Sequence, residues 1–227
     1  DYWRVVAMDN NTVVETNPAV QSATLARGEV LEFSSDQDFV ITTSKPVQVA
    51  QILASSQEVL AKPQLASCEN HDDCHVGYSC KYSDFEDLSC FPPTCEDESD
   101  DSCPAGHRCT CFDPVHCACQ ALGDPTLLLV APLEQYRKSY FFLTPDSYLV
   151  DYVNIVAPVG TEVTLDNLPV SAASFVPIGD SGYQVARLLV EDGSHIVSST
   201  VPVGVTVYGY DKDVSYGYVA GLNLKKE

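Results

Sequence analysis

Basic residues are scarce in this sequence. Only 12 lysines and arginines stand against 32 aspartates and glutamates among 227 residues, which gives a formal net charge of −20. A field of this sign repels nucleic acids and anionic lipids, so binding to either is disfavoured. Basic surfaces and divalent cations remain compatible partners.

The sequence also lacks an apolar run long enough to cross a bilayer, which takes about eighteen or more consecutive residues. The longest apolar stretch, Leu127 to Pro132, has the length of a buried strand. No basic and apolar pattern of a signal peptide follows Asp1, so we expect a mature or excised part of a larger chain.

Helical periodicity is missing too, whereas valine, threonine, serine and tyrosine are plentiful, and this composition predicts an all-β fold. A short helix is possible only at Ser55–Lys62. Strands are expected at Tyr2–Met8, Thr12–Glu15, Glu29–Phe33, Asp38–Thr43, Val47–Leu53, Thr126–Pro132, Tyr140–Leu143, Tyr148–Ala157, Glu162–Asp166, Phe175–Ile178, Gln184–Glu191, His195–Ser199, Val203–Tyr210 and Val214–Leu224.

Two parts of the sequence share a pattern. Residues 2–7 and 10–13 match residues 152–157 and 160–163, and residues 38–49 match residues 194–205 with Pro46 opposite Pro202. The shared order and spacing predict a degenerate tandem duplication. The fold expected from it is a pair of related β-sandwich-like halves that share a core.

Cysteine is absent everywhere except between residues 68 and 119. That segment has almost no aliphatic residues and an even number of cysteines, so we expect a small module stapled by disulfides in an oxidising, extracellular or cell-surface setting. Its ten cysteines are Cys68, Cys74, Cys80, Cys90, Cys95, Cys103, Cys109, Cys111, Cys117 and Cys119.

Zinc is the alternative for these cysteines, because His107 and His116 lie near Cys109 and Cys119. The close pairs are Cys-x-Cys, however, whereas structural zinc sites usually space their thiolates by two to four residues. Disulfides are therefore favoured.

The module is expected to occupy a hairpin loop of the first half. The strand that ends at Ala54 should pair with Thr126–Pro132, just as the later strand after Pro202 turns at residues 211–213 and returns. Loop tips tolerate insertions because the cost of loop closure grows slowly with length. We therefore expect a duplicated β domain of residues 1–66 and 120–227 and a cysteine module of residues 67–119.

A family resemblance rests on Gly123-Asp124-Pro125-Thr126, Pro132 to Tyr136, Tyr152 to Pro158, and Lys45-Pro46-Val47. Together these motifs resemble the N-terminal domain of the IgGFc-binding protein family, which includes secreted mucus proteins and exported bacterial surface proteins. The resemblance covers the chain outside the cysteine module. It implies an extracellular binding or adhesive module without catalysis.

Two candidate ligand surfaces can be predicted. One is the acidic run of Glu96, Asp97, Glu98, Asp100 and Asp101, which could attract a basic partner or calcium. It lacks the spacing of an EF-hand, and a solvated loop is the favoured interpretation over a calcium site. The other is a tyrosine face. If residues 211–213 form a turn that pairs residue 208 with 216, one face carries Tyr208, Tyr210, Tyr216 and Tyr218.

Such aromatic faces bind sugars or proteins, but the tyrosines could also cover the sheet between the two halves. No nucleophile, phosphate-binding or metalloprotease motif is present, and His195 is expected on a strand, at the surface or half-buried, without a catalytic role. No cofactor is expected. The function predicted is non-catalytic recognition of an extracellular protein or glycan. A structural spacer of a larger surface fibre and a secreted hydrolase with dispersed residues are the alternatives.

If all ten cysteines are paired in disulfides, alkylation of the unfolded protein without reductant should label no thiol. Mass spectrometry would detect each label. Stoichiometric zinc in the purified protein would contradict the prediction.

Overall fold

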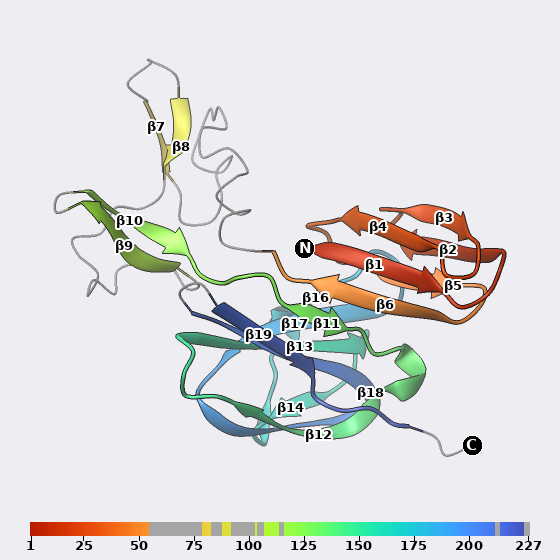
Figure 1. The fold of residues 1–227 in the computed structure, drawn as a ribbon. Coiled ribbons are helices and arrows are strands. Elements are labelled where there is room, and N and C mark those ends of the chain that lie inside the picture. Colours follow the sequence, from red (N-terminus) through yellow and green to blue (C-terminus); the bar gives the residue numbers. More distant parts are fainter. Residues whose placement is uncertain are drawn as a thin grey trace. The chain divides into compact units, whose positions relative to one another are not determined.

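The structure, a computed structural model, describes residues 1–54, 79–82, 88–91, 103, 107–113, 116–211 and 214–224. The chain is all-β, as predicted, with short 3₁₀ helices at Leu133–Gln135 and Ala172–Ser174 (Figure 1). Within these described ranges no helix has the length and apolarity to span a membrane. The helix considered for Ser55–Lys62 lies outside the described residues.

Nineteen strands follow one another along the described chain. They are β1 (Tyr2–Ala7), β2 (Thr12–Asn17), β3 (Ser22–Leu25), β4 (Val30–Ser34), β5 (Val40–Thr43), β6 (Val47–Ile52), β7 (Ser79–Tyr82), β8 (Leu88–Phe91), β9 (His107–Asp113), β10 (His116–Ala121), β11 (Leu127–Leu129), β12 (Arg137–Thr144), β13 (Val150–Pro158), β14 (Val163–Leu165), β15 (Leu168–Pro169), β16 (Phe175–Pro177), β17 (Tyr183–Val190), β18 (Gly193–Asp211) and β19 (Val214–Val219).

The first half of the fold, β1–β6 with β11, is a sandwich of two antiparallel sheets. One sheet has the order β11-β6-β1-β4 and the other the order β3-β2-β5. Because side chains alternate along a strand, Val5 and Ala7 of β1 point inward and meet Val14 of β2 and Leu25 of β3 in a buried core.

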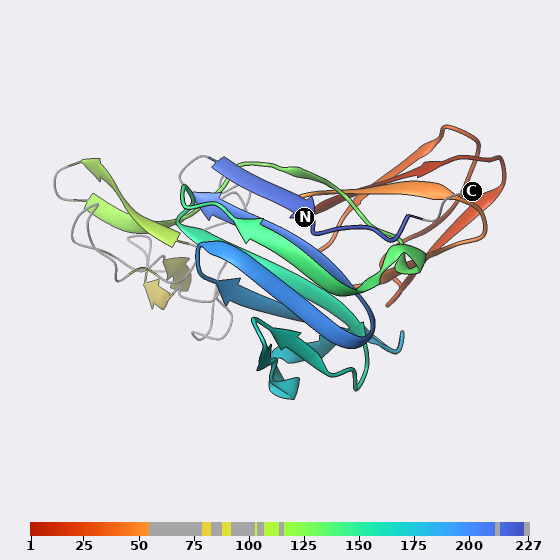
Figure 2. The same ribbon diagram turned by 90° about the horizontal axis from the view of Figure 1, so that it is seen from below.

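The second half, β12–β19, is built around one long strand. The sheet order is β15-β14-β18-β13-β17-β16, and β12 and β19 also pair with β18 (Figures 1 and 2). Its buried core includes Val153 and Ile155 of β13 with Val203, Val205 and Val207 of β18. β18 therefore supplies both the hydrogen-bonding centre and much of the core of this half.

The prediction of two separate strands at His195–Ser199 and Val203–Tyr210 was wrong, because β18 runs through both without a break. Pro202 lies between the two predicted strands. Opposite β12, Ser139 pairs with Ser198 while Arg137 pairs with Val203, so β18 carries an irregularity that contains Pro202. A proline lacks the N–H of a regular ladder and is accommodated at such a bulge.

The two halves share one pattern of strand pairing. β1 lies between β4 and β6 as β13 lies between β17 and β18, and β2 pairs with β3 and β5 as β14 pairs with β15 and β18. β11 beside β6 corresponds to β19 beside β18. This common pattern is what a tandem duplication would produce, and the duplication itself stays a prediction.

One residue of the predicted repeat alignment needs correction. Asn11 and Gly160 both have positive φ, and the next residue in each case is a threonine whose hydroxyl donates to the carbonyl three residues back, at 2.7 Å. Thr12 is therefore equivalent to Thr161, whereas the sequence alignment placed it opposite Glu162. A turn of this kind needs a residue that tolerates the left-handed conformation, and asparagine and glycine both do.

β6 and β11 pair as predicted. Leu127 lies opposite Ile52 and Leu129 opposite Ala50, and the N–H of Val130 donates to the carbonyl of Val49 at 2.9 Å. The two strands that flank the long insertion thus join in one sheet. In the second half, β18 and β19 pair across residues 212–213 as predicted, although β19 ends at Val219, earlier than the expected Leu224.

The chain divides into two compact units. One consists of Asp1–Leu53, Pro125–Gly209 and Ser215–Glu227 and contains both sandwich halves, and the other consists of Ala54–Asp124 and Tyr210–Val214. Both sandwich halves therefore belong to one compact unit.

Candidate functional site

The acidic run from Glu96 to Asp101 lies outside the described residues, so its geometry and its possible calcium binding stay predictions. Of the ten cysteines, Cys103 and Cys119 form a disulfide, and Cys109 is also disulfide-bonded. Cys109 and Cys119 lie opposite each other on the antiparallel pair β9 and β10, and both are buried. For these three cysteines the prediction of disulfide bonds is confirmed.

The tyrosines do not form the predicted single face. Along β13, Asp151 and Val153 are buried on the core side, so Tyr152 and Asn154 point to the opposite side of the sheet. Tyr216 donates to Asp151, whereas Tyr208 stacks on Tyr152 with ring centroids 5.4 Å apart. Tyr216 therefore lies on the core side and Tyr208 on the outer side.

The reason is a difference of one residue in register. The N–H of Ala220 donates to the carbonyl of Val205 at 3.0 Å, which places Tyr208 opposite Gly217 rather than opposite Tyr216. A slip of one residue moves every side chain of a strand to the other face. Tyr210 is half-buried at the end of β18 and stands two residues after Tyr208, so its side chain points to the same outer side of the sheet.

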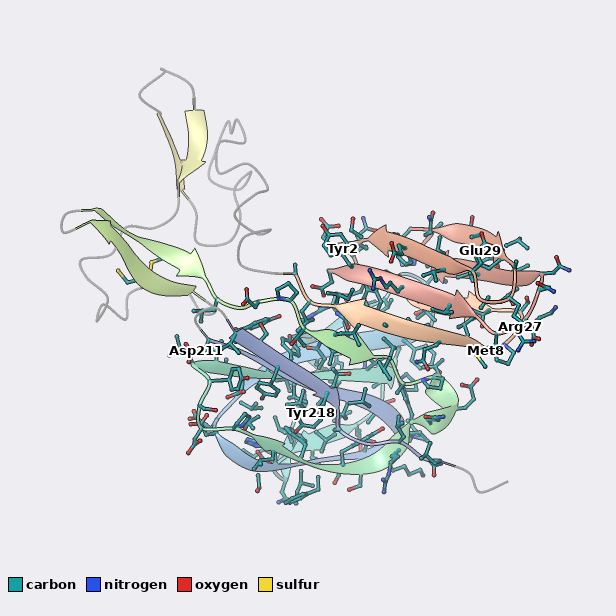
Figure 3. The ribbon with its side chains drawn as sticks, in the orientation of Figure 1. Tyr2, Met8, Arg27, Glu29, Asp211 and Tyr218 are labelled. Atoms are coloured by element: carbon teal, nitrogen blue, oxygen red, sulfur yellow. A yellow bond between two sulfur atoms is a disulfide. The ribbon has the colours of Figure 1, made fainter. Side chains whose placement is uncertain are left out.

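The core-side tyrosines bind β12 and β13. The hydroxyl of Tyr218, which Figure 3 labels on β19, donates to the carbonyl of Leu143 at 2.6 Å and accepts from the N–H of Leu143 at 3.1 Å. Tyr216 reaches the buried carboxylate of Asp151 because residue 209 is glycine, where a Cβ would collide with both groups. Burial raises the pKa of Asp151, and the nearby Asp192 raises it further, against the lowering effect of the Tyr216 hydrogen bond.

The outer-side cluster joins the two halves. Tyr208 donates to Asn154 at 3.1 Å, and burial raises its pKa to about 12. On the same face, Arg187 lies opposite Asn154 and forms an ion pair with Asp38 of the first half. The interpretation that tyrosines cover the sheet between the halves therefore fits Tyr208, and does not fit Tyr216 or Tyr218.

His195 is more buried than predicted, with 6% of its surface exposed. Its Nδ1 lies 2.7 Å from Asp166 Oδ2 and its Nε2 lies 2.7 Å from the carbonyl of Glu191, while Phe142 stacks on the ring. A carbonyl and an ionised carboxylate can only accept, so both hydrogen bonds form together only when both ring nitrogens carry protons. The geometry therefore favours the imidazolium form of His195.

The pKa values of this pair agree with that geometry. Burial lowers the pKa of His195, but the hydrogen bonds to Asp166 and to the Glu191 carbonyl outweigh it and raise the pKa above the ordinary 6.5. For Asp166, burial raises the pKa, and hydrogen bonds from His195 and from the Ile196 N–H outweigh it and lower the pKa below 3.8. His195 thus connects Asp166, in the β14–β15 turn, to Glu191, in the β17–β18 turn.

Both ring nitrogens of His195 are thus hydrogen-bonded within the fold. A cavity of about 360 Å³ in the first half is lined by Glu15, Thr16 and residues 19–22, and contains no histidine. Among the residues that the structure describes, no cluster of three metal-ligating side chains occurs.

Sequence reasoning missed the partners of these residues. A strand was predicted up to Asp166, whereas Asp166 and Asn167 form a tight turn with positive φ, and nothing in the sequence connects that turn to His195 across 29 positions. The pairing of Arg187 with Asp38 spans 149 positions and carried no signal at all.

A family model described as IgGFc binding protein matches residues 1–73 and 106–209. No curated protein and no solved structure gives a significant match. The match covers more than half of the chain, and it stops on either side of residues 74–105. The unmatched stretch is narrower than the cysteine module expected at residues 67–119, because the β9–β10 hairpin falls within the match.

The His195–Asp166 pair predicts how stability depends on pH. Because the folded pKa of His195 is raised, its contribution is complete below pH 6.5 and is lost as pH rises through the folded pKa. The contribution of Asp166 is present above pH 3.8 and is lost as pH falls through its lowered pKa.

Urea unfolding of the wild type and of His195→Gln would measure this. At pH 6 the variant should be less stable by about 1–3 kcal/mol, because a charge-assisted hydrogen bond is lost. The difference should shrink as pH rises past the folded pKa of His195. A difference that is the same at pH 6 and at high pH would contradict an imidazolium at this position.

Proposed function

The chain belongs to the IgGFc-binding protein family, and from this premise we propose that it recognises a protein or glycan at an extracellular surface and catalyses no reaction. Family membership indicates an extracellular binding module. The antibody binding in the name of the family is not assigned to this chain. Adhesion, the class of target and the position of the contact are our proposal.

We place the primary contact in the cysteine module. The observation that carries this proposal is that the family model matches the flanks of residues 74–105 but not the stretch itself. This stretch lies in the connection between β6 and β11, whose pairing it leaves intact. Binding residues concentrate on loops that a scaffold projects, so a segment added to the family pattern is where target selection would lie.

The acidic charge of the module indicates what kind of partner it would bind. Residues 68–119 contain twelve acidic residues against Lys81 and Arg108, so the segment carries −10 of the net −20. The Cys103–Cys119 disulfide cross-links part of it, and cross-linking reduces the entropy lost on binding. We therefore propose a partner that presents basic groups, or acidic groups bridged by calcium, and binding that weakens as salt screens the acidic field.

In the described β domain, several polar side chains already form hydrogen bonds within the fold, and this supports placing the target contact in the cysteine module. Tyr208, Tyr216 and Tyr218 each use their hydroxyl within the fold. His195 uses both ring nitrogens. A structural spacer would share all of these features, so only a binding measurement separates the two roles.

Charge-matched variants provide that measurement. Asp97→Asn with Asp100→Asn removes two charges from the module, and Glu134→Gln with Glu162→Gln removes two exposed charges from the β domain. Binding to an immobilised layer of poly-L-lysine should weaken about threefold to tenfold for the module variant, since each exposed ion pair contributes up to about 1 kcal/mol. The β-domain variant should bind like the wild type.

Equal weakening by both variants would mean that the whole-molecule charge, and not the module, drives binding. The same pair of variants can be compared on cell surfaces with and without calcium. A cation bridge predicts that chelation removes binding by the wild type to acidic surfaces.

A further inference from the structure

The turn between β1 and β2 contains an acceptor signal for a sugar chain. Asn10-Asn11-Thr12 is the one place in the sequence where asparagine, a residue other than proline, and serine or threonine follow one another. In secreted proteins this tripeptide directs the attachment of an oligosaccharide to the asparagine, and it stands on surface loops. The tripeptide alone is a weak signal, so the geometry of the turn has to decide whether Asn10 suits the modification.

The side chain of Asn10 is exposed and held in a defined orientation. The backbone N–H of Arg27 donates to Asn10 Oδ1 at 2.9 Å. Because an N–H can only donate, this contact identifies the amide oxygen and places Nδ2 on the other side of the carboxamide group. Among the residues that the structure describes, none accepts a hydrogen bond from Nδ2. A sugar on Nδ2 would therefore leave the contact with Arg27 intact.

The equivalent turn of the second half shows that the fold does not require an asparagine here. The hydroxyls of Thr12 and Thr161 each donate to the carbonyl three residues back, at 2.7 Å, so the two turns have the same form. The position of Asn10 is taken in the second half by Val159, which is 60% exposed. The turn thus depends on its threonine, and the first position can present different side chains to solvent.

The turn lies at one end of the first half. Figure 3 shows Met8 and Arg27 at this end and Tyr2 at the other. Tyr2 pairs with Ile52, so the chain leaves β6 toward residue 54 at the end remote from Asn10. Lys45, in the β5–β6 connection, donates to the Asn10 carbonyl and fixes the turn further.

We propose that Asn10 is an acceptor of N-linked glycosylation. In the transfer, Nδ2 forms a bond to the anomeric carbon of an oligosaccharide, the bond from that carbon to the pyrophosphate of a lipid carrier breaks, and the amide gives up one proton. Thr12 is 0% exposed in the folded turn and its hydroxyl is hydrogen-bonded, so the signal is read before this turn folds. The attached glycan is bulky and solubilising, and keeps this end of the first half out of protein contacts.

Expression of the full chain behind a secretion signal in cultured mammalian cells tests the proposal. The intact mass should show one glycan, and peptide N-glycosidase should remove all of it. Removal in heavy-oxygen water should convert Asn10 to a labelled aspartate in the peptide map. The secreted and the intracellular protein should both be measured, so that poor secretion does not prevent the reading.

Two variants serve as matched controls. Asn10→Asp removes the amide nitrogen but retains an oxygen that can accept from the Arg27 N–H, so it should lose the whole glycan while circular dichroism shows the wild-type fold. Val159→Asn places the same acceptor signal on the equivalent turn, at residues 159–161, and should gain a second glycan.

A wild-type mass that peptide N-glycosidase leaves unchanged would overturn the proposal, and so would a glycan of undiminished mass on Asn10→Asp. A single glycan on Val159→Asn would contradict the argument that this form of turn presents its first residue for modification.

Discussion

The pairing of β11 with β6 is the constraint on which the rest of the structure depends. β11 is only three residues long, yet it closes the first sandwich along β6 and buries Leu128 against Gly217 of β19. Thr126, next to it, donates its hydroxyl to the carbonyl of Ser215 at 3.0 Å. The same short segment therefore completes a sheet of the first half and packs against the second half. It comes directly after the long connection of residues 53–126.

This constraint explains why the family pattern tolerates an insertion there. The cost of closing a loop rises slowly with its length, so adding residues 74–105 changes little for the strands on either side. Among the described residues, the buried core of this half is formed by Val5 and Ala7 of β1, Val14 of β2 and Leu25 of β3. The scaffold and the acidic segment can then vary independently, which is consistent with the proposed contact through the added stretch.

Much of the β domain could be predicted from the sequence because its signals are local. Alternation of apolar residues indicates β1, β13 and the later part of β18, and the repeat indicates the β6–β11 pairing. The β3 strand, Ser-Ala-Thr-Leu, was missed because a short polar strand gives almost no periodic signal. The continuity of β18 was missed because Pro202 is ordinarily a strand end.

The candidate site was harder to predict because it depends on register and on distant pairs. A register one residue different sent Tyr216 and Tyr218 to the core side and left Tyr208 between the halves. The imidazolium of His195 depends on a carbonyl and a carboxylate from two other turns, which no sequence pattern connects. Local patterns thus define strands, while side-chain partners require the tertiary arrangement.

Native-state hydrogen exchange of Leu128→Ala tests the central claim most directly. If β11 joins the two halves, the variant should lose about 2–5 kcal/mol of stability, as buried leucine truncations do, and protection should fall by a similar amount at Val5 in β1 and at Ile155 in β13. Loss of protection confined to β1, β4 and β6, with β13 and β18 unchanged, would show that the halves are stable independently and would contradict the account.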